Sequence, residues 1–283
     1  MLLRFENEIG KMEIGGGGHP IWNMTSISGL GYPNKEFNTA RYGRTAGQRT
    51  LSSSYLARTI TVTGDIKRDI REFEIAKAIR ILDLPGTLYV YGRMKKKKIA
   101  GYCSAFECGE KEGSHTPFTM QFVCDDPFFE DIKETTVDVF RREDMIKGTF
   151  SFPMVFTNRY TEADIIISGD CESLPIFRIY NTPKSIATLV ATQGIEIRNE
   201  TTGQFIGLDC ETVSGEVITI DIASREITSN VRGDIIENMT DDTFLDRFWL
   251  QKGTNHISVT NYNTAEEINV VCAYSNRYLE AIS

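Results

Sequence analysis

Alternating apolar and polar positions predict several strands in the first half of the chain. Residues 59–63 (TITVT) alternate in the manner of a half-buried strand, and we expect Gly64 to end it. Residues 88–91 and 99–106 indicate two more strands joined through a basic turn. Residues 118–124 place every second apolar side chain on one face. The first half is therefore predicted to be rich in β-structure.

One helix interrupts these strands. Asp69 and Glu72 have the spacing of a capping box, and the residues that follow keep a period of about 3.6 until Pro85 and Gly86 stop the helix. The predicted apolar face of this helix consists of Ile66, Ile70, Phe73, Ile79 and Leu82.

Short strands separated by turn sequences fill the second half. Turn signals such as Ser214-Gly215 and Lys252-Gly253 recur at the spacing of an all-β sandwich. Poor periodicity from residue 128 to 151 indicates a boundary or linker, so we predict domains at 1–148 and 149–283. The predicted strands are 176–180, 186–190, 195–198, 205–208, 217–221, 257–259 and 269–274.

Composition agrees with two folded domains. The chain has 283 residues, of which 41% are hydrophobic and 25% charged, as in ordinary globular proteins. No apolar run is long enough to cross a bilayer and the N-terminus lacks a signal-peptide pattern, so we expect a protein that is made and kept in a cytoplasm, without membrane contact.

Charge is distributed unevenly between the two halves. Residues 1–148 hold 22 basic and 20 acidic side chains, whereas residues 149–283 hold 9 and 19. Basic residues concentrate between Lys35 and Lys98, so a nucleic-acid footprint could only be local and does not extend over the chain. We expect no sequence-specific binding of nucleic acid.

Candidate catalytic and metal sites are weak. The six cysteines form no CxxC pair and the three histidines lie far apart, so we expect reduced thiols, no metal and no cofactor. The glycine run at 15–18 lacks the helix and Lys-Ser/Thr pair of a phosphate loop, and Ser52, Ser53 and Ser54 lack a histidine partner. Asp125 and Asp126 would point to opposite faces of a strand. We expect no enzyme.

Two features allow two interpretations each. The lysines at 95–98 could bind an anionic surface, but a solvated hairpin tip is favoured. Trp249 beside Phe248 could stack on a sugar, but a core aromatic is favoured.

Several short motifs, taken in order, resemble the distal tail protein (Dit) family of long-tailed, siphovirus-type bacteriophages and phage-tail-like particles. In the first half these are 27–31 (ISGLG), 43–51, 58–66 (RTITVTGDI), 85–90 (PGTLYV) and 122–128 (FVCDDPF). In the second half they are 199–206 (NETTGQFI), 215–221 (GEVITID) and 250–255 (LQKGTN).

The resemblance implies a mainly β protein in which an N-terminal β-barrel-like domain, with one α-helix and an extended arm, precedes a C-terminal galectin-like β-sandwich. It also implies a structural, non-catalytic baseplate hub at the virion tail tip, synthesised in the bacterial host cytoplasm. Residues 1–148 would form a homo-hexameric ring. This ring would connect the tail tube protein and the tape measure protein to the tail-associated lysin or receptor-binding protein.

A carbohydrate-binding adhesion module for host recognition is the alternative. Galectins that bind sugars use a His-Asn-Arg cluster with a Trp and a Glu-Arg pair, whereas Trp249 here is followed by Leu-Gln-Lys and His256 lacks those companions. We therefore expect no binding of simple galactosides. Ring formation separates the two functions, because a hub must oligomerise.

Four arginines, Arg41, Arg44, Arg49 and Arg58, flank a Gly- and Ser-rich segment without a core pattern. In the family the matching region is an arm that reaches the neighbouring subunit. We expect these arginines to pair with acidic groups across the subunit interface, because the guanidinium fork can bind a carboxylate through two hydrogen bonds.

Overall fold

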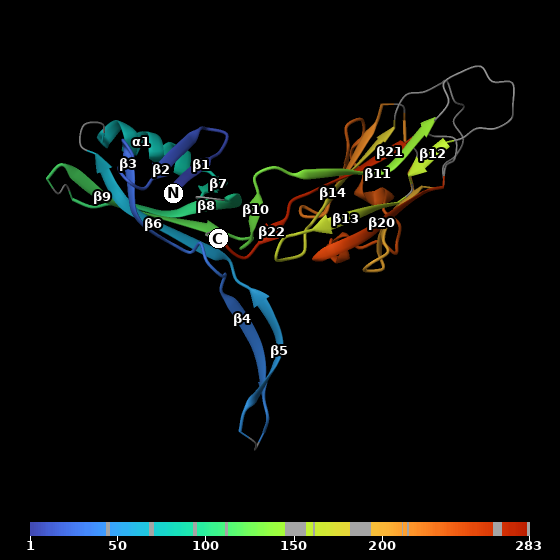
Figure 1. The fold of residues 1–283 in the computed structure, drawn as a ribbon, viewed down its shortest axis with the longest axis horizontal. Coiled ribbons are helices and arrows are strands. Elements are labelled where there is room, and N and C mark those ends of the chain that lie inside the picture. Colours follow the sequence, from blue (N-terminus) through green and yellow to red (C-terminus); the bar gives the residue numbers. More distant parts are fainter. Residues whose placement is uncertain are drawn as a thin grey trace. The chain divides into compact units, whose positions relative to one another are not determined.

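The computed structural model describes all residues except 44–45, 68–70, 93–94, 111–112, 145–156, 161, 182–193, 211, 214, 263–267 and 282–283. The chain forms two compact units, and each is described by itself (Figure 1). The first unit comprises Met1–Ile132 and Arg277–Ser283, and the second comprises Lys133–Asn276. Compared with the predicted boundary at 148, the second unit begins earlier and the last residues return to the first unit. The reason is that part of the expected linker is a strand of the second unit.

The first unit is built on a closed seven-stranded barrel. Its strands are hydrogen-bonded in the order β8-β7-β1-β2-β3-β6-β9, and β9 also pairs with β8, which closes the sheet. Closure leaves no long unpaired edge within the barrel. The strands are β1 (Leu2–Glu6), β2 (Lys11–Gly15), β3 (Trp22–Ser28), β6 (Arg58–Lys67), β7 (Gly86–Tyr91), β8 (Lys96–Cys108) and β9 (His115–Cys124).

The predicted strand at 59–63 is present but longer than expected. It is β6, which continues through Gly64 to Lys67. Gly64 lies where the register between β3 and β6 shifts, and a Cβ atom there would come within 2.2 Å of the Asn23 carbonyl oxygen. Glycine therefore permits a close approach of two strands at this position instead of ending one.

The predicted helix is also present, as α1 (Arg71–Leu82), but its predicted apolar face is wrong in part. Ile66 belongs to β6, Ile70 lies outside the described residues, and Phe73 and Ile79 are exposed. Leu82 is buried as predicted, together with Ala78 and Ile81, which the prediction missed. The predicted face counted Ile66, a strand residue, as part of the helix, whereas the buried side chains of α1, at Ala78, Ile81 and Leu82, lie three to four residues apart on another face.

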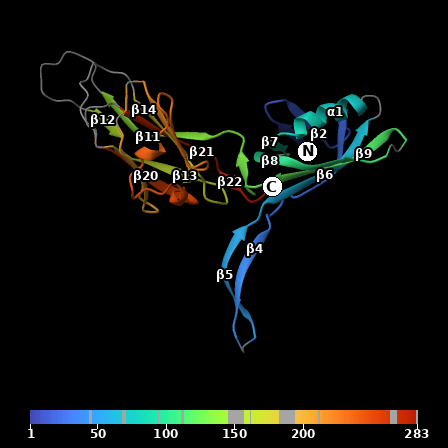
Figure 2. The ribbon, with the colours of Figure 1, turned by 180° about the vertical axis from the view of Figure 1, so that it is seen from behind.

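Two strands leave the barrel as a separate hairpin. β4 (Lys35–Arg41) pairs with β5 (Gln48–Tyr55) and with no other described strand. Both ribbon views show this hairpin, which we call the arm, extending away from the barrel (Figures 1 and 2).

Two short strands mark where the chain passes between the units. β10 (Phe129–Asp131) pairs with the barrel strand β8, and β22 (Arg277–Tyr278) pairs with β10. The outgoing and returning segments are thus hydrogen-bonded to each other within the first unit.

The second unit is a β-sandwich. One sheet has the order β12-β11-β21-β14-β17-β18-β19 and the other the order β13-β20-β15-β16. Both sheets contribute to one hydrophobic core, in which Phe177 and Phe248 pack edge to face. The strands are β11 (Thr135–Asp144), β12 (Thr157–Tyr160), β13 (Glu162–Ile167), β14 (Ile176–Asn181), β15 (Ile195–Asn199), β16 (Gln204–Leu208), β17 (Val217–Asp221), β18 (Glu226–Ser229), β19 (Gly233–Asp234), β20 (Gly253–Asn261) and β21 (Ile268–Tyr274).

The predicted fold class, mainly β with a barrel, one α-helix, an arm and a sandwich, is confirmed. Six of the seven strands predicted in the second half coincide with β14, β15, β16, β17, β20 and β21, and the seventh, at 186–190, lies outside the described residues. The poorly periodic segment contains β10 and β11. In the described residues, no helix is long and apolar enough to cross a membrane.

Candidate assembly surface

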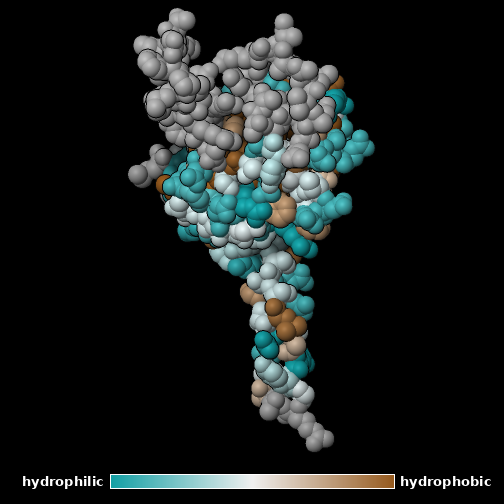
Figure 3. Space-filling view, turned by 90° about the vertical axis from the view of Figure 1, so that its right-hand side faces the viewer, coloured by the Kyte–Doolittle hydropathy of each residue, from teal (hydrophilic) through white to brown (hydrophobic). Residues whose placement is uncertain are grey.

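The arm exposes apolar side chains that its own chain leaves uncovered. Phe37 is 58% exposed and Leu51 is 59% exposed. Figure 3 shows apolar atoms among polar ones along the protruding arm. Because a two-stranded hairpin without further packing is only marginally stable in water, an arm of this kind gains stability from a partner.

The strand register gives the arm two different faces. Phe37 and Arg41 lie on the same face of β4, four residues apart. In β5, Leu51 lies at the point where the register between β4 and β5 shifts. It is two residues from Ser53, which pairs with Phe37, so it lies on the same face of the hairpin as Ser53. Phe37, Leu51 and Arg41 therefore share one face.

An aromatic cluster anchors the base of the arm. The Lys35 ammonium lies 4.2 Å from the ring centroid of Tyr55, and hydrogen bonding with Tyr32 and Tyr55 raises the pKa of Lys35. Tyr55 packs edge to face on Phe128, with ring centroids 5.0 Å apart. The backbone N–H of Leu56 donates to the Asn34 carbonyl at 2.9 Å, which closes the hairpin. The arm is thus held at its base and exposed beyond it.

The structure separates the four predicted interface arginines. Arg41 and Arg49 are exposed on the arm, and Arg44 lies outside the described residues. Arg58 is different, because it is only 4% exposed. Its guanidinium donates to the carbonyl oxygens of Pro127, Gly29, Gly31 and Leu279 at 2.5–2.8 Å and lies over the ring of Phe129.

Arg58 therefore differs from its predicted role. Its donors join three segments of its own unit: the loop before the arm, the segment before β10 and the C-terminal segment. Burial lowers the pKa of Arg58, but a guanidinium stays charged at neutral pH. The sequence could not distinguish it from Arg41, since the carbonyl acceptors come from distant parts of the chain.

The prediction that the lysines at 95–98 form a solvated hairpin tip is wrong for Lys97. Lys95 precedes β8, but Lys97 is buried within it, and the Lys97 ammonium contacts Asp131 at 2.9 Å and lies over the Tyr278 ring. Arg277 likewise pairs with Asp126 and covers the ring of Phe128. These ion pairs attach β10 and β22 to the barrel.

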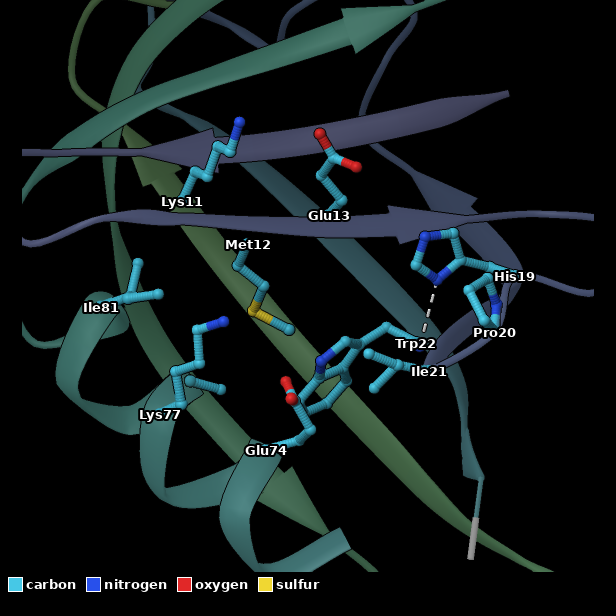
Figure 4. A pocket seen from close by; sticks show the side chains of 11 residues that line it. Lys11, Met12, Glu13, His19, Pro20, Ile21, Trp22, Glu74, Lys77 and Ile81 are labelled. Atoms are coloured by element: carbon cyan, nitrogen blue, oxygen red, sulfur yellow. Dashed lines mark hydrogen bonds between the residues drawn. The ribbon is translucent and has the colours of Figure 1, made fainter. Parts of the chain in front are cut away.

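A cavity of about 340 Å³ opens between α1, β2 and the loop before β3 (Figure 4). Its floor is apolar, because Met12, Trp22, Ala78 and Ile81 line it and are buried. Trp22 is held by its edge-to-face contact with Phe118 and by its backbone N–H, which donates to His19 Nδ1 at 3.2 Å. Sequence reasoning missed this cavity, because residues of β2, β3 and α1 line it and these elements meet only in the folded chain.

Charged side chains surround that apolar floor. In Figure 4, Lys11 and Lys77 lie on the side of Ile81, and Glu13 and Glu74 lie nearer His19. The Glu13 carboxylate forms an ion pair with the Arg4 guanidinium, at 2.9 Å. The cavity therefore presents an apolar recess with both signs of charge at its rim.

The second unit contains a buried carboxylate that sequence reasoning missed. The side chain of Glu216 is fully buried, accepts hydrogen bonds from Ser229 and from the Val213 N–H, and pairs with Arg232 at 2.8 Å. Burial opposes ionisation, but the hydrogen bonds from Ser229, Val213 and Arg232 outweigh it and lower the pKa of Glu216. This network ties the turn before β17 to the end of β18.

The remaining candidates do not form a catalytic group in the structure. Phe248 is buried as favoured, whereas Trp249 is half-buried. His256 lies between Asp164 and Glu162, at 2.7 and 3.0 Å, on an exposed face. All six cysteines are described and none forms a disulfide, and no group of three or more metal-binding side chains occurs among the described residues.

Comparison with known proteins connects this geometry with a protein family. Residues 169–278 match the family model for the siphovirus-type tail component, C-terminal domain, which is named for the Dit protein of phage SPP1. This match covers most of the second unit. No curated protein matches the sequence.

Solved structures extend the likeness over both units. The fold is similar to SPP1 Dit, described as a paradigm of hub adsorption apparatus in Gram-positive infecting phages, with a TM-score of 0.63, 13% identity and coverage of 91% of this chain and 93% of the other. It is also similar to a chain of the phage P2 baseplate in its activated conformation with Ca, with a TM-score of 0.53, 13% identity and 97% coverage of both chains. A third match is the corresponding p2 baseplate structure with Sr, with a TM-score of 0.53, 14% identity and coverage of 95% and 97%. The predicted resemblance to the Dit family is confirmed.

Proposed function

We propose that this protein is a structural, non-catalytic hub of a phage tail tip that assembles as a hexameric ring. The ring connects the tail tube and tape measure proteins on one side to the tail-associated lysin or receptor-binding protein on the other. The first unit, Met1–Ile132 with Arg277–Ser283, carries ring formation, and the second unit, Lys133–Asn276, is the galectin-like domain. The protein is synthesised in the bacterial host cytoplasm and acts in the virion.

The single observation that carries this proposal is the arm, joined to a unit with a tail-component domain. The arm offers apolar surface at Phe37 and Leu51 and positive charge at Arg41 and Arg49. Covering each of the two apolar side chains contributes on the order of 1.5–3 kcal/mol before the cost of association. In a closed ring the arms of several copies bind at once, so the stability of the ring exceeds that of a single arm contact.

Arg41, Arg44 and Arg49 supply the specificity of this contact through carboxylates on the neighbouring subunit. Charge at an interface fixes register and excludes wrong partners more than it adds affinity. Arg58 is not part of this surface, because its donors are used inside its own unit.

Electron microscopy of the negatively stained full chain tests the ring directly, by its rotational symmetry, alone and within assembled tails. We expect sixfold rings in the assembled tail. A ring of any other symmetry there would refute the hexamer.

A triple variant tests the arginines. Replacing Arg41, Arg44 and Arg49 with Glu should block ring assembly while the melting temperature and circular dichroism of the monomer stay nearly unchanged. The matched control replaces Lys133, Arg225 and Lys252, which are exposed basic residues of the second unit, with Glu and should assemble normally. Normal assembly of the arginine variant would contradict the interface role.

Glycan binding distinguishes the hub from the adhesion module. We expect no micromolar binding of simple galactosides by calorimetry or on a glycan array. Binding that disappears in Trp249→Ala would instead favour the adhesion module.

A further inference from the structure

We propose that the cavity beside α1 receives the arm of the next copy of this chain, with Phe37 inserted over Met12 and Trp22 and with Arg41 paired to Glu74. This inference rests on the proposed function, since it concerns how the ring closes. A ring of identical subunits joined head to tail needs two different surfaces on each subunit, one that projects and one that receives. The arm is the projecting surface, and its chain must offer a second one.

The floor of the cavity suits a single large apolar side chain. Met12 and Trp22 are 5% and 3% exposed, and Ala78 and Ile81 complete the apolar lining. Trp22 packs edge to face on Phe118, whereas the unbranched side chain of Met12 can adapt its shape to an inserted group. A volume of about 340 Å³ has room for an aromatic ring.

One side of the rim, at Glu74, complements the positive charge of the arm, whereas Lys11 and Lys77 lie on the side of Ile81. Glu74 makes no ion pair or hydrogen bond with any described residue, and it lies at the cavity on the half-buried side of α1. Glu13, the other carboxylate at the rim, already pairs with Arg4. Glu74 is therefore the carboxylate available to an incoming arginine, and partial burial strengthens such a pair.

The arm presents the complementary set on one face. Phe37, Leu51 and Arg41 share that face, whereas the opposite face carries Asn38 and Ser52, a polar pair. One face of the arm therefore offers an apolar side chain followed by a cation along the strand. This order corresponds to an apolar floor beside Glu74, which has no ion-pair partner among the described residues.

Photo-crosslinking of the full chain tests the docking site even when assembly is weak. A benzophenone amino acid replaces Phe37, the variant is mixed with isotopically labelled wild-type chain, and the crosslinked peptides are identified by mass spectrometry. We expect crosslinks to Met12 or its neighbours in the cavity of the labelled copy. Crosslinks to another surface of that copy, or none at millimolar protein, would overturn the proposal.

A charge exchange tests the predicted pair. Arg41→Glu and Glu74→Lys should each raise the protein concentration needed for assembly at least tenfold, and the double variant should restore it to within about threefold. The matched control, Glu72→Lys, changes an exposed carboxylate of the same helix that does not line the cavity and should have no effect.

The outcomes separate this proposal from the proposed function. If Arg41→Glu blocks assembly but Glu74→Lys behaves like Glu72→Lys, the arm still forms the interface and the cavity assignment is wrong. If both variants form wild-type rings, the arm itself is not the interface. Rotational symmetry in electron micrographs tests the hub independently of either variant.

Discussion

Replacing Arg58 with Met should destabilise the first unit strongly. The guanidinium donates four hydrogen bonds of 2.5–2.8 Å to carbonyl oxygens. Methionine keeps most of the packing against Phe129 but supplies no donor. The variant therefore isolates the hydrogen bonds from the volume of the side chain.

The expected magnitude follows from the acceptors. Pro127 is buried, so its carbonyl loses a partner without access to water, at a cost of about 1–3 kcal/mol. Gly29, Gly31 and Leu279 are half-buried, and their carbonyls can regain water, which leaves a net loss of about 0.5–1 kcal/mol each. We expect the free energy of unfolding of the first unit to fall by about 3–5 kcal/mol.

Tryptophan fluorescence can follow the first unit alone. The chain has two tryptophans, and Trp249→Phe leaves Trp22 in the barrel as the only one. Urea unfolding in this background should show the loss for Arg58→Met and a smaller loss for Arg58→Lys, because a single ammonium cannot span all four acceptors. Arg49→Met, an exposed position, is the control and should change stability by less than about 0.5 kcal/mol. A loss below about 1 kcal/mol for Arg58→Met would refute the reasoning.

Three further predictions concern other features of the two units. Glu216→Gln should lower the stability of the second unit by about 2–3 kcal/mol at neutral pH. Because the folded pKa of Glu216 is depressed below 4.5, wild-type stability should decline as the pH falls below that value, and urea unfolding should show the difference from the variant shrinking by pH 3. Gly29→Ala should cost more than about 2 kcal/mol, since Gly29 has a φ of +88° and a Cβ atom would lie 2.1 Å from the Thr59 carbonyl oxygen, whereas Gly43→Ala, with open space around it, should cost less than about 0.5 kcal/mol in the same thermal unfolding assay. Hydrogen bonding to Asp164 and Glu162 raises the pKa of His256, so an NMR titration should place it above 6.5 and Asp164→Asn should lower it; a wild-type value at or below 6.5 would exclude these pairs in solution.

The local pattern of apolar and polar residues was sufficient to predict an element when that element buries one face in the core of its own unit. The alternation at 118–124 corresponds to β9, in which Phe118, Met120, Phe122 and Cys124 are all buried. The same logic located the sandwich strands with one-residue differences at several ends, because turn glycines separate them. The arm escaped this logic, since an element without a core on either face has no apolar period to detect.

The candidate interface residues likewise differ in whether local sequence or long-range contacts determine their surroundings. The sequence showed that Arg41, Arg44, Arg49 and Arg58 flank a segment without a core pattern. It could not distinguish a buried arginine from an exposed one among these four. Only folding brought Gly29, Pro127 and Leu279 around one guanidinium, and this made Arg58 internal while Arg41 stayed exposed.

The sequence by itself determined the β-rich composition of both halves, the single helix, the sandwich strands and the likeness to tail proteins. These depend on periodicity and turn residues, which act over a few neighbouring positions. Tertiary structure decided the closure of the barrel between β8 and β9, the cavity under α1, the burial of Lys97 and Arg58, and the return of the C-terminal residues to the first unit. Each of these arises from contacts between residues far apart in the chain, whose energies no local pattern encodes.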